Sequence, residues 1–254
     1  MPVTLEKQGH IAFITIDRPE RRNAFNAQMT REMREVLVEL EADPELRVAI
    51  LTGNGPVFCA GMDLAAFTSG EGPEIVSGKG RFAGFVAAER TKPVIAAVQG
   101  AAVAGGMEIM LACDLAIAAE GSVFGVPEVK RGLVAGGGGT FRLTRRVPHA
   151  IANEMLLTGD PISCDKALAH GLLNAVVPAD QLMTTATEMA EKIAANAPLA
   201  VRFSLQQSKQ SLDGDEVADW QLNDQLWPLI ENSEDATEGA TAFVEKRAPV
   251  WKGA

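Results

Sequence analysis

The stretch Ile95–Cys113 reads IAAVQGAAVAGGMEIMLAC, and it predicts a buried strand followed by a helix that opens at a pair of glycines. Its residues are almost all apolar or small, and Glu108 is the only charged side chain among them. A carboxylate is costly to bury on such a helix unless its charge or its proton is used. Glu108 is therefore either a candidate functional residue or a carboxylate that caps or pairs within the core.

A second stretch, Val123–Gly132, reads VFGVPEVKRG and places Glu128 directly after a proline. The simpler explanation is that Glu128 is a solvated surface residue whose charge is compensated by the neighbouring Lys130 and Arg131. The glycine run Gly136–Gly139 follows shortly afterwards. It could present backbone N–H groups to an anion at a helix N-terminus, or it could form a flexible connection beside a substrate.

Strand and helix patterns alternate in the first part of the chain, which predicts an α/β fold with parallel strand pairing. The segment Ala27–Glu41 has the period of an amphipathic helix, with Asn26 as its N-cap. The glycine-rich region Glu71–Gly84 is a candidate mobile flap. The expected strands are Val3–Lys7, Ile11–Ile16, Val48–Leu51, Val94–Val98, Leu115–Ala118 and Val123–Gly125. From about Ala150 the pattern changes to helices, expected at Ile151–Leu157, Asp165–His170, Gln181–Ala195, Ala200–Ser211 and twice more beyond.

The composition is that of an ordinary globular protein, with 47% hydrophobic and 22% charged residues in a chain of 254. A net charge of −10 argues against nucleic acid or an anionic membrane as the main partner. We expect no secretion signal and no membrane span, because the chain shows no charged-then-apolar leader and no run of about 18 apolar residues. A cytoplasmic location is the expectation.

Several common chemistries lack their motifs in this sequence. There is no G-x-x-x-x-G-K-[ST] loop, no G-x-S-x-G elbow and no H-E-x-x-H pair. The cysteines Cys59, Cys113 and Cys164 are isolated, and the 3 histidines are scattered. Neither a disulfide framework nor a metal site is expected from this pattern.

A pair of carboxylates and glycine-opened helix ends are suited to reactions at a carbonyl group. A helix that starts at Gly105 points free N–H groups outward, where they stabilise negative charge that develops on an oxygen. The loop Phe58–Leu64, FCAGMDL, also has small residues that let its backbone approach a ligand, and Asp63 stands at its expected helix start. Two such N–H donors facing one another would form an oxyanion hole. The simpler reading is that Ala60–Gly61 is a plain strand-to-helix turn.

At this point the sequence resembles the enoyl-CoA hydratase/isomerase, or crotonase, superfamily over nearly its whole length. Each matching element is weak alone, and their shared order and spacing make a chance agreement improbable. The elements are Arg18–Pro19 with Asn23–Ala24, Phe58 to Leu64, Gly100 to Glu108, Pro127–Glu128, Gly138–Thr140 with Arg142–Leu143, and Glu238–Gly239 with Ala242–Phe243 and Glu245–Arg247.

The resemblance implies a spiral core of repeated ββα turns that form two roughly perpendicular sheets. It implies that residues 1–195 form this core with the active site, and that residues 196–254 form a helical region that mediates assembly into a homotrimer or a dimer of trimers. The expected activity is that of a carbon–oxygen lyase of fatty-acid or related acyl-CoA metabolism. It would add water across the 2,3 double bond of a 2-enoyl-CoA to give 3-hydroxyacyl-CoA.

The resemblance also implies roles for individual residues. Catalysis falls on the backbone N–H groups of Met62 and Gly105, which form the oxyanion hole, and on Glu108, which activates water, and Glu128, which protonates C2. No metal or redox cofactor is expected. The implied substrate-binding residues are Ala24, Ala60, Met62, Asp63, Leu64 and Gly105. Because the chain is acidic overall, the coenzyme A phosphates need a local basic cluster. The candidates for it are Arg18, Arg21 and Arg22, with Lys246 and Lys252 from the same or a neighbouring subunit.

Some positions depart from the family pattern and leave more than one function open. Ala65 and Ala66 stand where many hydratases have a lysine after the F-x-A-G-x-D-[IL] element, and Leu133–Ala135 replaces the usual proline of the glycine-rich loop. The ending Glu245–Gly253 also resembles hydratases of the carnitine pathway that act on crotonobetainyl-CoA. An enoyl-CoA isomerase and a non-catalytic protein that binds acyl-CoA also fit the superfamily. The retained pair of glutamates favours a hydratase.

Overall fold

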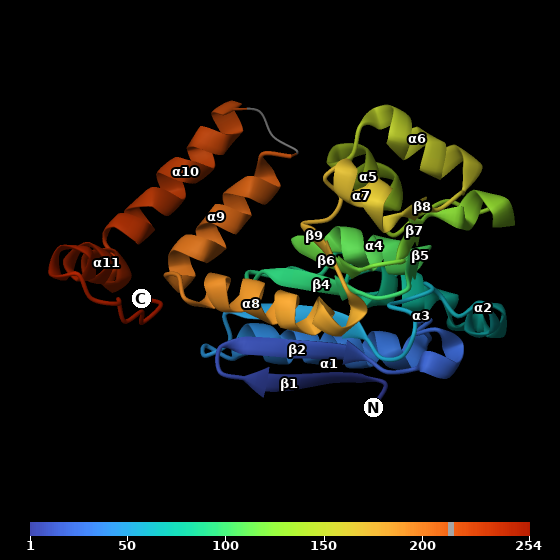
Figure 1. Ribbon diagram of the computed structural model, residues 1–254, viewed down its shortest axis with the longest axis horizontal. Coiled ribbons are helices and arrows are strands. Elements are labelled where there is room, and N and C mark those ends of the chain that lie inside the picture. The colour runs from blue at the N-terminus through green and yellow to red at the C-terminus, as the bar shows by residue number, and fades with distance from the viewer. Residues whose placement is uncertain (213–215) are drawn as a thin grey trace.

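The computed structural model describes the backbone of residues 1–212 and 216–254, and the side chains of these except 216–219 and 243–244. The side chain of Phe243, part of the C-terminal motif, therefore lies outside the described residues. Six strands form the larger sheet in the order β1-β2-β3-β4-β6-β9 (Figure 1). Their bounds are β1 Val3–Gln8, β2 Ile11–Ile16, β3 Val48–Gly53, β4 Val94–Val98, β6 Leu115–Ala119 and β9 Ala175–Val177.

Parallel pairing was predicted, and it is confirmed for every neighbouring pair of this sheet except β1 with β2, which is antiparallel. A turn at the predicted Gln8–Gly9 region joins these two strands directly, and only an antiparallel pair can be joined by so short a turn. The four remaining pairs need crossover connections, which the intervening helices supply.

A second sheet contains β5 Ala101–Val103, β7 Val123–Gly125 and β8 Ile162–Ser163. The chain leaves β4 of the large sheet, enters β5 of the small one and continues into helix α4, Gly105–Ala112. It then repeats the step, from β6 to β7 to the short 3-10 helix η4, Pro127–Arg131. Each turn thus gives one strand to each sheet, which is the ββα arrangement that the resemblance implied.

The larger sheet is covered on both faces by helices. Helix α1, Ala27–Ala42, begins where predicted, because the Asn26 side chain accepts a hydrogen bond of 3.0 Å from the N–H of Met29. It packs its apolar face into the main core together with α4. Helix α8, Leu182–Ala194, covers the opposite face with Leu182 and a row of alanines. Successive strand residues alternate between these two cores, as the period of a strand requires.

The candidate flap Glu71–Gly84 forms a packed wall. It contains α3, Gly72–Val76, and the 3-10 helix η3, Phe82–Gly84, preceded by α2, Leu64–Ala66, and η2, Phe67–Glu71. Ile75 and Phe82 are buried in the main core. The Glu71 carboxylate accepts a hydrogen bond of 2.8 Å from the N–H of Ala27 at the start of α1. The buried side chains of Ile75 and Phe82, together with this hydrogen bond, hold the segment in place despite its glycines.

The prediction that only helices follow Ala150 was wrong at two places, because β8 and β9 add a strand to each sheet. Strands of two and three residues are too short to show a period in the sequence. The other elements of this half are α5 Gly139–Arg146, α6 His149–Thr158, α7 Cys164–Ala169, η5 Ala179–Gln181, α9 Pro198–Gln210, α10 Glu216–Glu231 and α11 Glu234–Glu245, while η1 Pro19–Arg21 lies earlier.

Helices α9, α10 and α11 extend to one side of the sheets (Figure 1). The predicted boundary at residue 195 falls directly after α8, the last helix that covers the large sheet. The C-terminal tail then returns toward this boundary, since the indole N–H of Trp251 donates to the carbonyl of Ala195 at 2.6 Å. Among the described residues, no helix combines the length and the apolar character needed to cross a bilayer.

Candidate active site

A cavity of about 350 Å³ is lined by loops and helix ends that connect the strands of the two sheets. Six of the residues proposed for the site line it: Ala60, Met62, Leu64, Gly105, Glu108 and Glu128. They come from the loop between β3 and α2, the first residue of α2, the first turn of α4 and the first turn of η4. Segments distant in sequence therefore converge on one apolar cavity.

Glu108 lies in the first turn of α4, and the residue is only 4% exposed. Its Oε1 accepts a hydrogen bond of 2.9 Å from the backbone N–H of Gly139. Burial raises the pKa of this carboxyl to about 7, although Gly139 and the nearby Arg142 favour the ionised form. The carboxyl therefore exchanges a proton near neutral pH, which is the range a general acid or base needs.

Glu128 follows Pro127 at the start of η4 and is half-buried on the cavity wall. Its Oε2 is buried, and it has no hydrogen-bond partner among the described residues. Burial also raises the pKa of this carboxyl. The alternative that Lys130 and Arg131 solvate Glu128 does not hold for this buried oxygen, because Lys130 pairs with Asp160 at 2.5 Å and Arg131 donates to the carbonyl of Lys130 at 3.1 Å.

The backbone N–H groups of Met62 and Gly105 are available to a ligand. Residues Gly61 and Asp63 on either side of Met62 bond to Phe25, at 2.8 and 2.9 Å. Within the described part of the chain, neither the N–H of Met62 nor that of Gly105 donates a hydrogen bond to the protein. Both residues line the cavity.

Two backbone features bring these donors together. Gly61 has a φ of +94°, and a Cβ there would lie 2.8 Å from the N of Gly105. Only glycine permits so close an approach of the two loops. Ala104, directly before Gly105, has a φ of +51° that a non-glycine residue seldom adopts. Strain of this kind is found at sites where the backbone must point in a particular direction.

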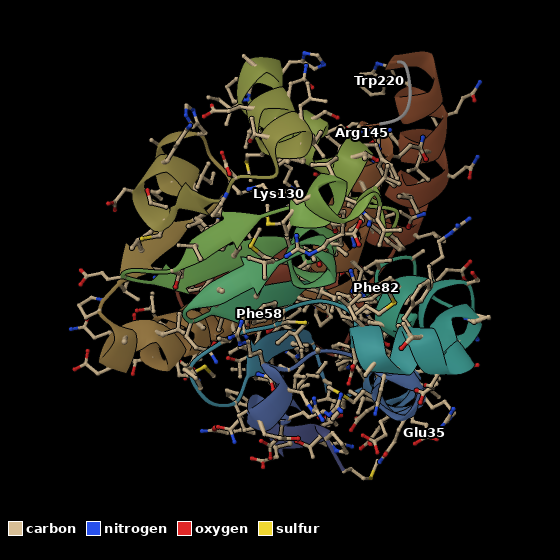
Figure 2. All side chains as sticks on the ribbon, turned by 90° about the vertical axis from the view of Figure 1, so that its right-hand side faces the viewer. Glu35, Phe58, Phe82, Lys130, Arg145 and Trp220 are labelled. Atoms are coloured by element: carbon tan, nitrogen blue, oxygen red, sulfur yellow. The ribbon has the colours of Figure 1, made fainter. Side chains whose placement is uncertain are left out.

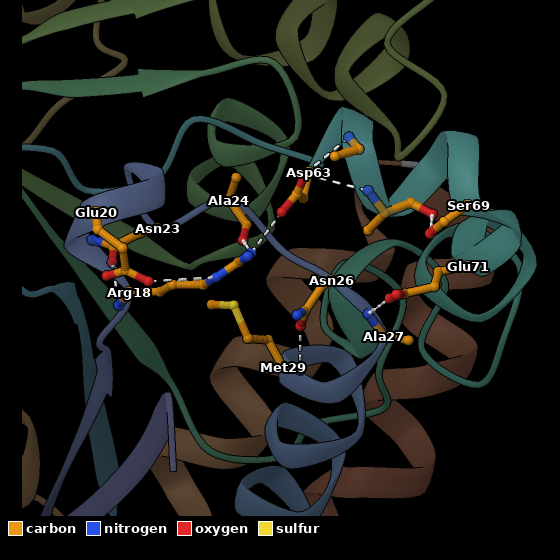
Figure 3. Close-up of polar contacts among 12 residues, drawn as sticks. Arg18, Glu20, Asn23, Ala24, Asn26, Ala27, Met29, Asp63, Ser69 and Glu71 are labelled. Atoms are coloured by element: carbon orange, nitrogen blue, oxygen red, sulfur yellow. Dashed lines mark hydrogen bonds and ion pairs between the residues drawn. The ribbon is translucent and has the colours of Figure 1, made fainter.

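Asp63 and Ala24 are absent from the cavity lining and belong to a network beside it (Figure 3). The Asp63 carboxylate caps α2 by accepting from the N–H of Ala65 at 3.0 Å, and it pairs with Arg18 at 2.8 Å. Arg18 also donates to the carbonyl of Ala24 at 3.0 Å. This arginine was a candidate for the phosphates, and the structure instead uses it to fix the loop that carries Met62.

The remaining two proposed residues lie in different places. Arg22 is exposed, and its carbonyl accepts a hydrogen bond of 3.0 Å from Ala60, so its backbone lies next to the cavity wall. Lys252 pairs with Glu234 at 2.6 Å near the C-terminus, which lies at the opposite end of the molecule from α2 (Figure 1). One chain alone does not bring Lys252 to the site, because the tail is tied to α11.

Sequence reasoning missed part of the wall. Phe82, labelled in Figure 2, comes from η3, and Val76 and Phe67 come from the neighbouring short helices. These irregular segments carry no periodic pattern that would have placed them. Gly139 did carry a signal, since one of the two explanations of the run Gly136–Gly139 was that it presents N–H groups to an anion. The anion that it contacts is Glu108.

The described residues contain no group of three or more histidines, cysteines or acids that could hold a metal ion. What the cavity offers is two carboxyls with raised pKa values and two N–H donors without a partner among the described residues, surrounded by apolar side chains. Such a set can stabilise an oxyanion and transfer protons to and from neighbouring atoms.

Known proteins match the chain over nearly its full length. The family model described as enoyl-CoA hydratase/isomerase matches residues 6–254. A carnitinyl-CoA dehydratase of Proteus mirabilis is 43% identical over 98% of this chain and 97% of its own length. The crystal structure of an enoyl-CoA hydratase from Mycobacterium tuberculosis has a TM-score of 0.95 at 45% identity, covering 100% of this chain and 99% of that one. A carnitinyl-CoA hydratase from Mycobacterium avium has a TM-score of 0.78 at 42% identity, with 100% and 99% covered.

Proposed function

This chain belongs to the enoyl-CoA hydratase/isomerase family and has its crotonase fold, and we propose that it hydrates a 2-enoyl-CoA thioester to the 3-hydroxyacyl-CoA. One observation carries the proposal. Two carboxyls with raised pKa values, Glu108 and Glu128, share an apolar cavity with the two unused N–H groups of Met62 and Gly105. A protein that only bound acyl-CoA would have no use for two carboxyls of this kind on one apolar cavity.

The N–H groups of Met62 and Gly105 would act on the thioester oxygen. Addition of water at C3 pushes electron density through C2 onto this oxygen and gives an enolate-like transition state. Two donors fixed in an apolar cavity stabilise that charge without reorganising, and the loss of one donor of this kind costs about 3–4 kcal/mol in other enzymes. Proton transfer and charge stabilisation suffice for this step, so we propose no metal or redox cofactor.

The two carboxyls would divide the proton transfers. Glu108 accepts the N–H of Gly139, and this bond favours its ionised form, so we assign it to accept the proton of the attacking water. The buried Oε2 of Glu128 has no such donor, which favours a protonated carboxyl ready to donate to C2. The charge of Glu128 also raises the pKa of Glu108, so we treat the two carboxyls as a coupled pair whose proton transfers are not independent.

A second candidate is hydration of crotonobetainyl-CoA, favoured by the relatives named carnitinyl-CoA dehydratase. Its acyl group ends in a quaternary ammonium, which would need aromatic faces or carboxylates around it. The cavity has Phe67 and Phe82 on its wall, and also Arg131, whose charge opposes a cation. Isomerisation of a double bond needs one acid–base carboxylate, and so the pair Glu108 and Glu128 favours hydration.

The deciding experiment is an activity screen with purified protein over 2-enoyl-CoA thioesters of increasing length and crotonobetainyl-CoA. Loss of the absorbance of the conjugated thioester reports hydration. We expect turnover of crotonyl-CoA or a longer uncharged substrate. Turnover of crotonobetainyl-CoA alone would assign the second candidate, and no turnover of any thioester would refute a hydratase.

We also propose that the protein works in the cytoplasm as a homotrimer or a dimer of trimers, with residues 196–254 as its oligomerisation region. Trp227 and Leu229 on α10 support this, because they are 56% and 57% exposed and large apolar side chains in such numbers mark interaction surfaces. In an assembly of this kind, Lys252 of one subunit could reach the phosphates of a coenzyme A bound to another.

A further inference from the structure

A second cavity of about 370 Å³ lies between the end of α4, helix α5 and helix α9, and it shares no lining residue with the first. Arg90, Arg142, Arg146 and Lys209 line it, as does Arg145, which is labelled in Figure 2. Asp114 is the only acid among its described lining residues. So strong a local excess of positive charge stands out in a chain of net charge −10.

Contacts with the end of α4 explain only part of this cluster. Arg90 donates to the carbonyl of Ala112 at 2.5 Å, and Arg146 donates to that of Cys113 at 2.7 Å. A helix C-terminus carries only about half a negative charge, so one cation would satisfy it. The Arg90 guanidinium also lies over the buried Phe85 ring, at 4.2 Å from its centre, and its Nε and Nη1 atoms are buried without a hydrogen-bond partner among the described residues. The positive charge of the cluster therefore stays largely unbalanced, because the described lining sets one carboxylate against five cations.

The other lining residues restrict the acceptor. Lys209 pairs with Asp114 at 2.8 Å, and Asp114 in turn accepts from the N–H of Val94, so the one carboxylate is already engaged. Guanidinium groups bind phosphate oxygens through paired N–H donors, and several at once suit an anion of more than one charge. The exposed ring of Phe141 and the apolar Leu205 leave room beside the cations for the carbon part of a phosphate ester.

We propose that this second cavity binds the phosphate group of a small molecule, and that its occupation acts on the first cavity through Arg142. Arg142 extends between the two. Its Nη1 donates to the carbonyl of Gly137 at 3.1 Å, and Gly137 lines the first cavity while Arg142 lines the second. A Cβ on Gly137 would lie 2.5 Å from Oε2 of Glu108, so the arginine holds the loop that covers the catalytic carboxyl.

An anion bound beside Arg142 would offset the positive charge of this arginine, which favours the ionised form of Glu108. The charged groups that act on Glu108 are Arg142 and Glu128. Those that act on Arg142 are Arg90, Arg145, Arg146 and Glu108. Phosphate binding should therefore raise the pH at which Glu108 titrates, because its carboxylate would lose part of its compensation.

Calorimetric titration of the full-length protein, without substrate, tests the site with inorganic phosphate in one arm and adenosine monophosphate in the other. Tighter binding of the nucleotide would assign a phosphate ester, and equal binding would assign free phosphate. Lys209→Gln should weaken either by roughly tenfold, the range for a hydrogen bond to a charged group. Lys166→Gln is the matched control, since Lys166 forms a similar ion pair with Glu154, at 3.0 Å, away from the cavity.

The coupling is read by NMR of labelled glutamate carboxyls, with Glu108→Gln to assign the signal. Phosphate at a concentration near its Kd for the wild-type protein should move the Glu108 midpoint to higher pH, and the shift should be much smaller in Lys209→Gln at the same concentration. Absence of phosphate and nucleotide binding by the folded wild-type protein overturns the proposal, as does equal weakening in Lys209→Gln and Lys166→Gln. Neither measurement uses substrate, so a protein that hydrates crotonyl-CoA and binds no phosphate would refute this inference and leave the proposed function intact.

Discussion

The backbone N–H of Gly139 donates a 2.9 Å hydrogen bond to Glu108, so the first residue of α5 meets the carboxyl in the first turn of α4. The positive end of one helix thus supports the negative charge on another. Burial pushes the pKa of Glu108 up, and this contact opposes the rise. The balance leaves the carboxyl titrating near neutral pH, where it can both accept and release a proton.

The glutamates should act as one unit. Glu108→Gln and Glu128→Gln should each lower kcat for crotonyl-CoA by roughly 10²–10⁴-fold, because each removes one proton transfer. The double variant should lose little more, since the remaining group cannot work alone. Steady-state kinetics of the three variants tests this. Near-normal turnover in either single variant would refute the assignment.

Glu108 should lower the stability of the fold above neutral pH. Its folded pKa of about 7 exceeds the ordinary value of 4.5, so the free energy of unfolding falls as pH rises from 4.5 to 7. Below that pH range the carboxyl is protonated in both the folded and the unfolded state, so it does not change the free energy of unfolding. Glu108→Gln should therefore be more stable than wild type by about 1–3 kcal/mol at pH 8, and equal to it near pH 4.

Denaturant unfolding of both proteins at the two pH values measures this difference. Glu35→Gln is the control, because Glu35 is an exposed glutamate on α1 (Figure 2). The prediction is wrong if the stability gain of Glu108→Gln is the same at both pH values, or if the control shows the same dependence.

Gly61→Ala should disrupt the oxyanion hole. The new methyl would lie 2.8 Å from the N of Gly105 and force the two donors apart, so we expect kcat to fall about a hundredfold or more. Gly132→Ala is the matched control, since Gly132 also has a positive φ, +70°, with nothing within 4 Å of the added carbon. Both variants should lose about 1 kcal/mol of stability from the positive φ, and Gly61→Ala should lose more because of its close contacts. Equal kcat values in Gly61→Ala and Gly132→Ala would show that the N–H groups of Met62 and Gly105 take no part in catalysis.

Periodic segments could be predicted from sequence and irregular ones could not. The strands of the large sheet and α1 follow from runs of apolar residues with a clear period, and their predicted bounds agree with the structure to within two residues. β9 was not predicted, because three residues are too few to show a period, although the strand completes the sheet edge beside β6. Its position is fixed by tertiary pairing with residues far away in sequence.

The site shows the same division. Glu108 could be found because a lone carboxylate on an apolar helix is anomalous in the sequence itself. The wall residue Phe82 could not, because its place depends on how a short irregular segment folds back over α4. The use of Arg18 as an anchor for Asp63 was also invisible, since an arginine that binds phosphate and one that pairs internally look alike in sequence.

Assembly should depend on the C-terminal helices. Removal of residues 196–254 should give a monomer or an aggregate in sedimentation velocity, where the full chain should run as a trimer or hexamer. Leu229→Ser should weaken the assembly, whereas Leu157→Ser should not, although Leu157 on α6 is the more exposed at 76%. A truncated chain that remains a soluble, active trimer would contradict the prediction.

The last prediction concerns the charge on coenzyme A. This chain is acidic overall, so the phosphates need a local cation, and Arg22 is exposed beside the backbone of Ala60 at the cavity wall. A phosphate contact acts on substrate and transition state alike, so Arg22→Ala should raise KM and leave kcat nearly unchanged. For an exposed charge we expect a change of about two- to fivefold, which should shrink at high salt.

The matched control is Arg31→Ala, an exposed arginine on α1, and Lys252→Ala tests the contribution of a neighbouring subunit. KM for crotonyl-CoA is measured at low and high salt for each variant. Because Lys252 is bound to Glu234 within its own chain, a rise in KM for Lys252→Ala requires that a second subunit bring it to the site. If Arg22→Ala matches the control at low salt, the phosphates bind elsewhere on the surface.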